Sequence, residues 1–159
     1  MRVIDALFPP LYVSAYHTHT ADNVAVTILS GRADAQGQAR IGFAGFSRGG
    51  YSHVITNPAN APMRFIDVEL LAADRGATGA PEGLEDHEVV LNNARVRVLR
   101  VKVDAAQAIA DHRHGAGYVS VTVRGGDGPG TWRWHGSADG TAPLRAGRQA
   151  LDIVEIEPK

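Results

Sequence analysis

Three histidines in the first half of the chain have the spacing of a metal centre. His17 and His19 are separated by one residue, and His53 follows further along the chain. Because side chains two residues apart in a β-strand point to the same face, His17 and His19 would project together, about 7 Å apart along the backbone. Two imidazoles on one strand and a third on a neighbouring strand suit a divalent transition metal. The sequence therefore predicts a three-histidine metal site.

The same pair of histidines recurs in the second half as His112 and His114. The offset from His17 is 112 − 17 = 95 positions, and sliding the sequence by 95 brings further identical residues together without a gap. Among these matches are Arg2 with Arg97, Val3 with Val98, Val24 with Val119 and Val26 with Val121. Repetition at one offset indicates an internal duplication. His112 and His114 form a weaker candidate site, because two imidazoles bind a metal poorly, and we expect the second half to be empty and structural.

Short runs in which apolar and polar residues alternate cover almost the whole sequence. The runs are rich in Val, Ile and Thr and end at Gly, Asn, Asp or Pro, which is typical of β-strands. Examples are Val24 to Leu29, Met63 to Leu70, Ala94 to Val103 and Leu151 to Glu157. The sequence predicts an all-β protein with two units, residues 1–70 and 86–159, joined by a Gly- and Ala-rich linker over residues 71–85.

The composition excludes several classes of function. Lys and Arg total 16 and Asp and Glu total 17, a formal net charge of −1, which provides no basic surface for nucleic acid. The chain has no cysteine, so it has no disulfide, no cysteine zinc site and no thiol nucleophile. Apolar runs are too short to span a membrane, and the N-terminus lacks a secretory pattern. We expect a cytoplasmic protein whose partner is a small molecule, with no nucleic acid and no membrane.

These patterns resemble the two motifs of the cupin superfamily, and the duplication resembles a small bacterial bicupin. The first cupin motif is G-x5-H-x-H-x3–4-E-x6-G, and the second is G-x5-P-x-G-x2-H-x3-N. The first half matches these motifs at His17, His19, Gly31, Gly50, His53 and Asn57, with Val24 at the acidic position. In the second half, Thr141 and Arg145 stand where the second motif needs His and Asn. The resemblance covers nearly the whole chain outside residues 72–83.

The resemblance implies two tandem cupin barrels, each a jelly roll or double-stranded β-helix. It implies that the first barrel holds one divalent transition metal (Zn, Fe, Ni, Mn or Cu) on His17, His19 and His53. With Val24 in place of the motif glutamate and Asn23 expected to face the other way, the site would be a neutral three-imidazole site. Because no carboxylate ligand would offset the charge of the metal ion, the occupied site would be more positive, and this would favour anionic or chelating substrates. The implied activity is that of a metal-dependent dioxygenase or a related enzyme.

Other functions are compatible with the same residues. The missing glutamate and the decayed second motif also fit a non-catalytic cupin that binds a small ligand or has a structural role, without a functional metal. A metal-free sugar-nucleotide epimerase of the same barrel class would need an acid–base pair, and the sequence does not indicate one. The first half begins at Arg2 without the segment that precedes Arg97, so an open sheet edge would favour a homodimer.

The places of other polar residues are predicted from their neighbours. Tyr51 lies two positions before the third histidine, on the same expected strand face, and Arg48 stands where the second motif usually has proline. Both are candidate pocket residues. Near the end of each half, an offset of 86 pairs Glu69 with Glu155, where we expect exposed rim carboxylates. His87 has no partner at ligand spacing and is expected at the surface.

Overall fold

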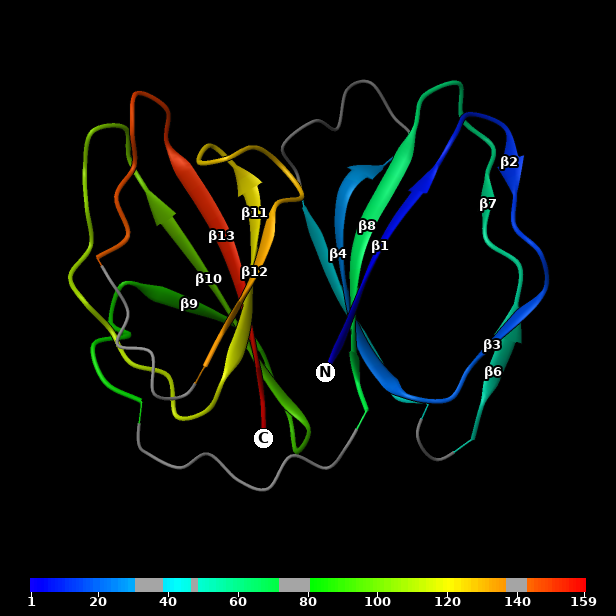
Figure 1. Ribbon diagram of the computed structural model, residues 1–159, viewed down its shortest axis with the longest axis horizontal. Helices are drawn as coiled ribbons and strands as arrows, with labels where there is room; N and C mark the ends of the chain where they lie inside the picture. Colours follow the sequence, from blue (N-terminus) through cyan, green and yellow to red (C-terminus); the bar gives the residue numbers. More distant parts are fainter. Residues whose placement is uncertain (31–38, 47–48, 72–80, 137–142) are drawn as a thin grey trace. The chain divides into compact units, whose positions relative to one another are not determined.

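The computed structural model describes residues 1–30, 39–46, 49–71, 81–136 and 143–159 (Figure 1). Within these residues every regular element is a β-strand, which confirms the predicted all-β fold class. In this part of the chain there is accordingly no helix of the length and apolarity that a membrane crossing requires. The chain divides into two compact units, Met1–Ala72 and Ala73–Lys159. Arg48, Thr141 and most of the expected linker lie outside the described residues.

The first unit consists of a four-stranded sheet and two short ladders. Its strands are β1 (Arg2–Phe8), β2 (Tyr12–Val13), β3 (His17–His19), β4 (Asp22–Ser30), β5 (Arg40–Ala44), β6 (Tyr51–His53), β7 (Thr56–Asn57) and β8 (Met63–Leu70). The sheet has the order β1-β8-β4-β5, and all its neighbours are antiparallel. β2 pairs with β7, and β3 pairs with β6. Figure 1 shows these ladders across the unit from β1, β4 and β8, so the unit has two layers.

The second unit contains one five-stranded antiparallel sheet. Its strands are β9 (His87–Asn92), β10 (Val96–Val103), β11 (Tyr118–Arg124), β12 (Trp132–His135) and β13 (Leu151–Pro158). Their order is β12-β11-β13-β10-β9. A hydrophobic cluster on β10 and β13 packs against Ile109 and Leu144 from the loops, which fixes these loops to the sheet.

The two sheets have the same strand order. β1, β8, β4 and β5 of the first unit correspond to β10, β13, β11 and β12 of the second. β9 has no counterpart among the described strands of the first unit, where β1 is an edge strand. This arrangement agrees with the open edge expected from the extra segment that precedes Arg97.

The strand register corrects one alignment of the two halves. Arg2 is opposite Glu69 across β1 and β8, and the corresponding Arg97 is opposite Glu157 across β10 and β13. Glu69 therefore corresponds to Glu157, an offset of 157 − 69 = 88, and not to Glu155. The offset of 86 is wrong for this strand, because it matched identical residues and not hydrogen-bonded positions.

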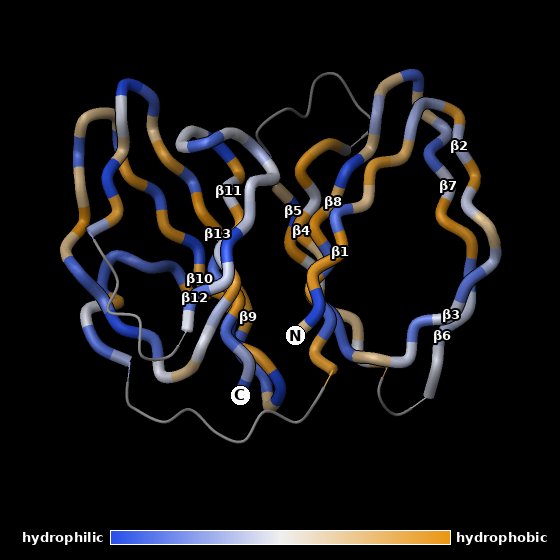
Figure 2. Tube along the Cα trace, viewed as in Figure 1, coloured by the Kyte–Doolittle hydropathy of each residue, from blue (hydrophilic) through white to orange (hydrophobic). Residues whose placement is uncertain are grey.

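The two faces of the central strand β8 differ in polarity. Ile66 and Val68 are fully buried on one face, and Asp67 and Glu69 alternate with them on the other face. In β13 the counterpart of Asp67 is Glu155, by the same offset of 88. All three of these acidic residues are buried. Figure 2 shows hydrophobic residues following the strands of both sheets, so these carboxylates are exceptions within apolar elements.

A cross-strand ion pair occurs at corresponding places in both units with its charges exchanged. In the first unit, Arg64 of β8 donates to Asp5 of β1 through Nε at 2.8 Å and through Nη2 at 2.7 Å. In the second unit, Arg100 of β10 donates to Asp152 of β13 through Nε at 2.9 Å and through Nη2 at 2.7 Å. Offsets of 95 and 88 relate Asp5 to Arg100 and Arg64 to Asp152, so the acidic and basic partners have changed strands.

The two ion pairs should differ in their contribution to stability. We expect Arg100→Met to lower the free energy of unfolding by about 1–3 kcal/mol, because Asp152 is only 6% exposed and loses its guanidinium partner. Arg64→Met should cost less than about 1 kcal/mol, because Asp5 is 41% exposed and water replaces the lost contact. Urea unfolding measures both losses, and equal losses would contradict the burial argument.

Candidate metal centre

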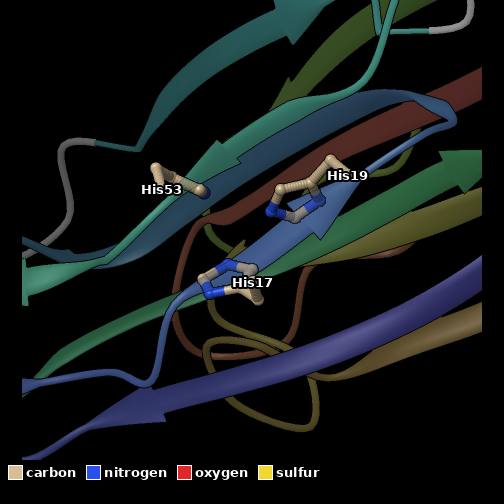
Figure 3. Close-up of side chains that lie close together, drawn as sticks. All are labelled: His17, His19 and His53. Atoms are coloured by element: carbon tan, nitrogen blue, oxygen red, sulfur yellow. The ribbon is translucent and has the colours of Figure 1, made fainter.

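The β3–β6 ladder brings three histidines together. The register places His17 opposite His53 and His19 opposite Tyr51. Ring centroids are 5.0 Å apart for His17 and His19, 4.7 Å for His17 and His53, and 5.2 Å for His19 and His53. Figure 3 shows the three side chains close together on the two neighbouring strands, and one nitrogen of each ring lies within 4.8 Å of the others. Two nitrogens on one zinc ion lie at most about 4 Å apart, so the cluster is near the size that a metal needs.

Hydrogen bonding leaves ring nitrogens available for a metal. His17 Nδ1 lies 2.9 Å from the carbonyl oxygen of Ala15. Because a carbonyl oxygen only accepts, Nδ1 carries the proton and Nε2 of His17 keeps its lone pair. His53 Nε2 is buried and makes no hydrogen bond. Burial, together with the charges of His17 and His19, lowers the pKa of His53 and so favours the neutral imidazole that metals bind.

Small and hydroxylated residues hold the ladder together. Thr18 and Ser52 are opposite each other, and their hydroxyl oxygens share a hydrogen bond of 2.7 Å. Gly50 precedes β6 at a point where a Cβ would lie 3.3 Å from the carbonyl oxygen of His19, closer than most side chains tolerate. These residues keep β6 near β3, and they therefore set the distance between the histidines.

Buried carboxylates of β8 lie next to His19. Glu69 Oε1 is 3.9 Å from His19 Nδ1, and Glu69 also accepts a hydrogen bond from Arg2 Nε at 2.6 Å. Asp67 accepts a hydrogen bond from Asn23 Nδ2 at 3.1 Å. Burial raises the pKa of Asp67 to about 6, with a contribution from Glu69 and against the opposing effect of His19. Glu69 is 3% exposed, so the expectation of a rim carboxylate is wrong.

Asn23, and not Val24, is the β4 residue on the face of these carboxylates. Asn23 is opposite Glu69 in register and donates to Asp67. Val24 is fully buried and opposite Val68, on the other face of the sheet. The expectation that Asn23 faces away is therefore wrong. The first motif allows three or four residues before its acidic position, and a spacing of three places Asn23 there in place of Val24.

Tyr51 borders the histidine cluster. Its ring centroid is 4.9 Å from that of His53, and it stacks on Phe46 at 5.4 Å with an interplanar angle of 7°. Phe46 lies 5.6 Å from His19, so the two aromatic rings form one side of the cluster. Tyr51 is 51% exposed and extends from the histidines to the solvent. Arg48, the other candidate pocket residue, is outside the described part of the chain.

In the second unit, His112 and His114 belong to a larger buried cluster with His87 of β9 and Glu155 of β13. The carboxylate oxygens of Glu155 lie 3.2 Å from His87 Nε2, 3.4 Å from His112 Nε2 and 3.1 Å from His114 Nε2. The expectations of a surface His87 and an exposed Glu155 are wrong, since both are buried. The position of Glu155 between the apolar residues Val154 and Ile156 is the sequence signal that could have indicated it.

Charge is concentrated in this second cluster. Burial disfavours the carboxylate of Glu155, but the three imidazoles hold its pKa well below the usual range. Burial also opposes a charge on His114, but hydrogen bonds to Glu155 and Glu157 raise its pKa. The cluster is therefore a buried anion surrounded by imidazoles, of which His114 has a raised pKa.

The comparisons with known proteins concern the fold. No family model and no curated protein sequence matches the chain. Among solved structures, the chain is similar to AerE from Microcystis aeruginosa, with a TM-score of 0.59, 10% identity, and coverage of 99% of this chain and 87% of that one. It also matches a cupin 2 conserved barrel domain protein from Leptotrichia buccalis, with a TM-score of 0.41, 10% identity, and coverage of 99% and 89%. At 10% identity, the likeness to AerE describes the fold alone.

The strand pairs of the described residues are antiparallel, as in the jelly roll that the cupin resemblance implies, and the motif histidines lie on the paired strands β3 and β6. The activity of the chain does not follow from the fold and depends on the residues of the site.

Proposed function

We propose that the first unit binds one divalent transition metal on His17, His19 and His53 and acts as a metal-dependent enzyme on a small anionic or chelating molecule. The observation that carries this proposal is the convergence of three imidazoles from two paired strands. One of them, His53, has a buried Nε2 without a hydrogen bond. Such a nitrogen is costly to bury, and a metal ion would satisfy it. Three imidazoles suit Zn, Fe, Ni, Mn or Cu.

A bound ion would supply a Lewis acid with open positions for a chelating substrate. The reaction that we assign to the site is oxidative cleavage of that substrate by dioxygen, which is the oxidant and whose two oxygen atoms would enter the cleaved product. The protein orients the ligands. The carbonyl of Ala15 sets the tautomer of His17, and Glu69 lies next to His19 while Arg2 holds its carboxylate. Because Arg2 balances Glu69, a dication on the imidazoles leaves the site positive, which favours an anionic ligand.

We also propose that the two units are tandem cupin barrels, residues 1–70 and 86–159, with residues 71–85 as the linker. The shared order of corresponding strands supports an origin by duplication. In the first unit β1 is a sheet edge, and such an edge supports the pairing of two copies into a homodimer.

Elemental analysis tests the metal proposal. Protein purified without chelator should lose one equivalent of metal per chain when His17→Ala and His53→Ala are combined, because two of the three ligands are gone. His135→Ala is the matched control, since His135 belongs to neither cluster and its Nε2 lies 2.8 Å from the Ser120 hydroxyl. An unchanged metal content in the double variant would exclude the proposed site.

A non-catalytic, ligand-binding cupin is favoured by one observation. Asn23, an amide bonded to Asp67, stands on the face where the motif would supply a carboxylate ligand. Thermal shifts with small carboxylates separate the two functions. A ligand at about 100 times its Kd adds about 2.7 kcal/mol. Stabilisation that requires a metal supports the enzyme, and stabilisation of metal-free protein supports the binding module.

A further inference from the structure

We infer that the second unit has a metal centre of its own, formed by His87, His112 and Glu155, with His114 as the fourth donor. One donor atom from each of the first three lies within 4.8 Å of the others. His114 Nε2 lies 3.1 Å from the same carboxylate of Glu155. The side chains of all four are at most 2% exposed, so the cluster lies in the interior of the unit.

His87 provides the first argument. Its side chain is completely buried, yet neither Nδ1 nor Nε2 makes a hydrogen bond. Nε2 lies 3.2 Å from Oε2 of Glu155 without the geometry of a shared proton. Buried polar atoms are normally paired. One cation bound by both Nε2 of His87 and Oε2 of Glu155 would satisfy the lone pairs of both atoms.

The charge of the cluster provides the second argument. A carboxylate in the protein interior requires positive charge beside it. The contacts to Glu155 come from imidazoles, while Arg97 of β10 donates to Glu157 through Nε at 2.9 Å. The compensating charge is therefore an imidazole proton or a metal ion. A dication with three neutral imidazoles and one carboxylate leaves a net charge of +1 and satisfies every donor with one ion.

The side chains of this proposed site do not all come from the two sequence motifs. In the first unit the third histidine comes from β6, whereas here it comes from β9, which has no described counterpart there. The segment before β9 is tied to the histidine pair by two backbone hydrogen bonds between Glu82 and Arg113, of 3.0 and 2.8 Å. Gly83 permits this approach: its φ is +69°, and a Cβ would lie 2.9 Å from the carbonyl oxygen of Asp111.

The donor set indicates a structural ion, with zinc as the best match. Four protein donors, three nitrogens and one oxygen, would leave no open position, which is typical of closed structural sites. His114 is also supported by neighbours that orient its ring. It stacks on Tyr118 at a centroid distance of 3.7 Å, and its Nδ1 lies 3.5 Å from Oε2 of Glu157. Outer contacts of this kind fix the direction of a ligating nitrogen.

The test uses the full chain with the first-unit histidines removed by His17→Ala and His53→Ala, so that the second cluster is unchanged. After treatment with chelator and dialysis, this variant is titrated with Co²⁺ and with Zn²⁺. We expect one equivalent of either ion per chain, the visible absorption of four-coordinate cobalt, and a higher Tm with metal. No bound ion would overturn the inference and would leave an imidazolium as the partner of Glu155.

A third substitution locates the bound ion. Adding Glu155→Gln should abolish cobalt binding, and an unchanged cobalt spectrum would overturn the inference. If far-UV circular dichroism shows that this variant is unfolded, His87→Gln replaces it. This substitution removes one proposed ligand, puts a neutral amide in its place and leaves the buried carboxylate of Glu155 unchanged. The two proposals can fail separately. The difference in metal content between wild type and the His17→Ala, His53→Ala variant tests the first unit. The Co²⁺ and Zn²⁺ titration of that variant tests only the second unit.

Discussion

In metal-free protein at pH 6, Glu155→Gln should lower the free energy of unfolding by about 3–5 kcal/mol, because one partner of a buried charge cluster is removed. The side chain of Glu155 is 1% exposed and contacts the rings of His87, His112 and His114. Hydrogen bonds to Glu155 and Glu157 raise the pKa of His114, and the variant would keep only Glu157 as an acidic neighbour of this buried ring. Gln has nearly the same shape as Glu, so the loss reports charge and not packing.

Urea unfolding followed by circular dichroism measures this loss. Glu85→Gln is the control, because Glu85 is exposed and a surface substitution changes stability by about 0.5 kcal/mol or less. A loss below about 1 kcal/mol for Glu155→Gln would show that the carboxylate is not the anchor of the cluster. Saturating Zn²⁺ should enlarge the difference between wild type and variant, since only wild type has all four donors.

Asp67→Asn should stabilise the metal-free protein at pH 8 by about 2–3 kcal/mol and leave its stability at pH 4 nearly unchanged. Burial raises the pKa of Asp67 from 3.8 to about 6. A carboxyl group with a raised folded-state pKa costs no stability below its unfolded pKa, and the cost grows as the pH rises through the folded pKa. A shift of about 2 units corresponds to about 3 kcal/mol above pH 6. The amide oxygen of Asn can still accept from Asn23.

Asp5→Asn is the matched control with the opposite sign. The hydrogen bond and charge of Arg64 lower the pKa of Asp5, so its contribution is present above pH 3.8 and is lost as the pH falls. Its variant should therefore be less stable than wild type at pH 8, where Asp67→Asn is more stable. Unfolding curves at pH 4, 6 and 8 give both comparisons. Parallel pH profiles for Asp67→Asn and wild type would exclude a perturbed Asp67.

The strands and the first histidine cluster could be predicted because local patterns determine them. Alternation of apolar and polar residues marks β4, β8, β10 and β13, and the one-residue spacing of His17 and His19 places both rings on one face. The pairing of β3 with β6 then brings His53 opposite His17. Motif spacing therefore contains enough information for a cluster whose side chains lie within the motifs.

Register and long-range pairing could not be predicted from the same patterns. Glu69 was matched with Glu155 because identical residues align, whereas hydrogen bonds between strands match it with Glu157. A shift of one residue also exchanges the faces of a strand, which is why Asn23 was expected to face away. His87 joins its cluster through the pairing of β9 with β10, a contact that depends on where another strand lies.

The exchanged ion pairs have a consequence for how the chain reaches its native structure. Two similar sets of strands in one polypeptide could pair with each other's partners during synthesis or refolding. If β1 joined β13, Asp5 would meet Asp152, and if β10 joined β8, Arg100 would meet Arg64; either crossed assembly sets like charges side by side. Repulsion between these like charges would disfavour both crossed assemblies relative to the native strand pairing.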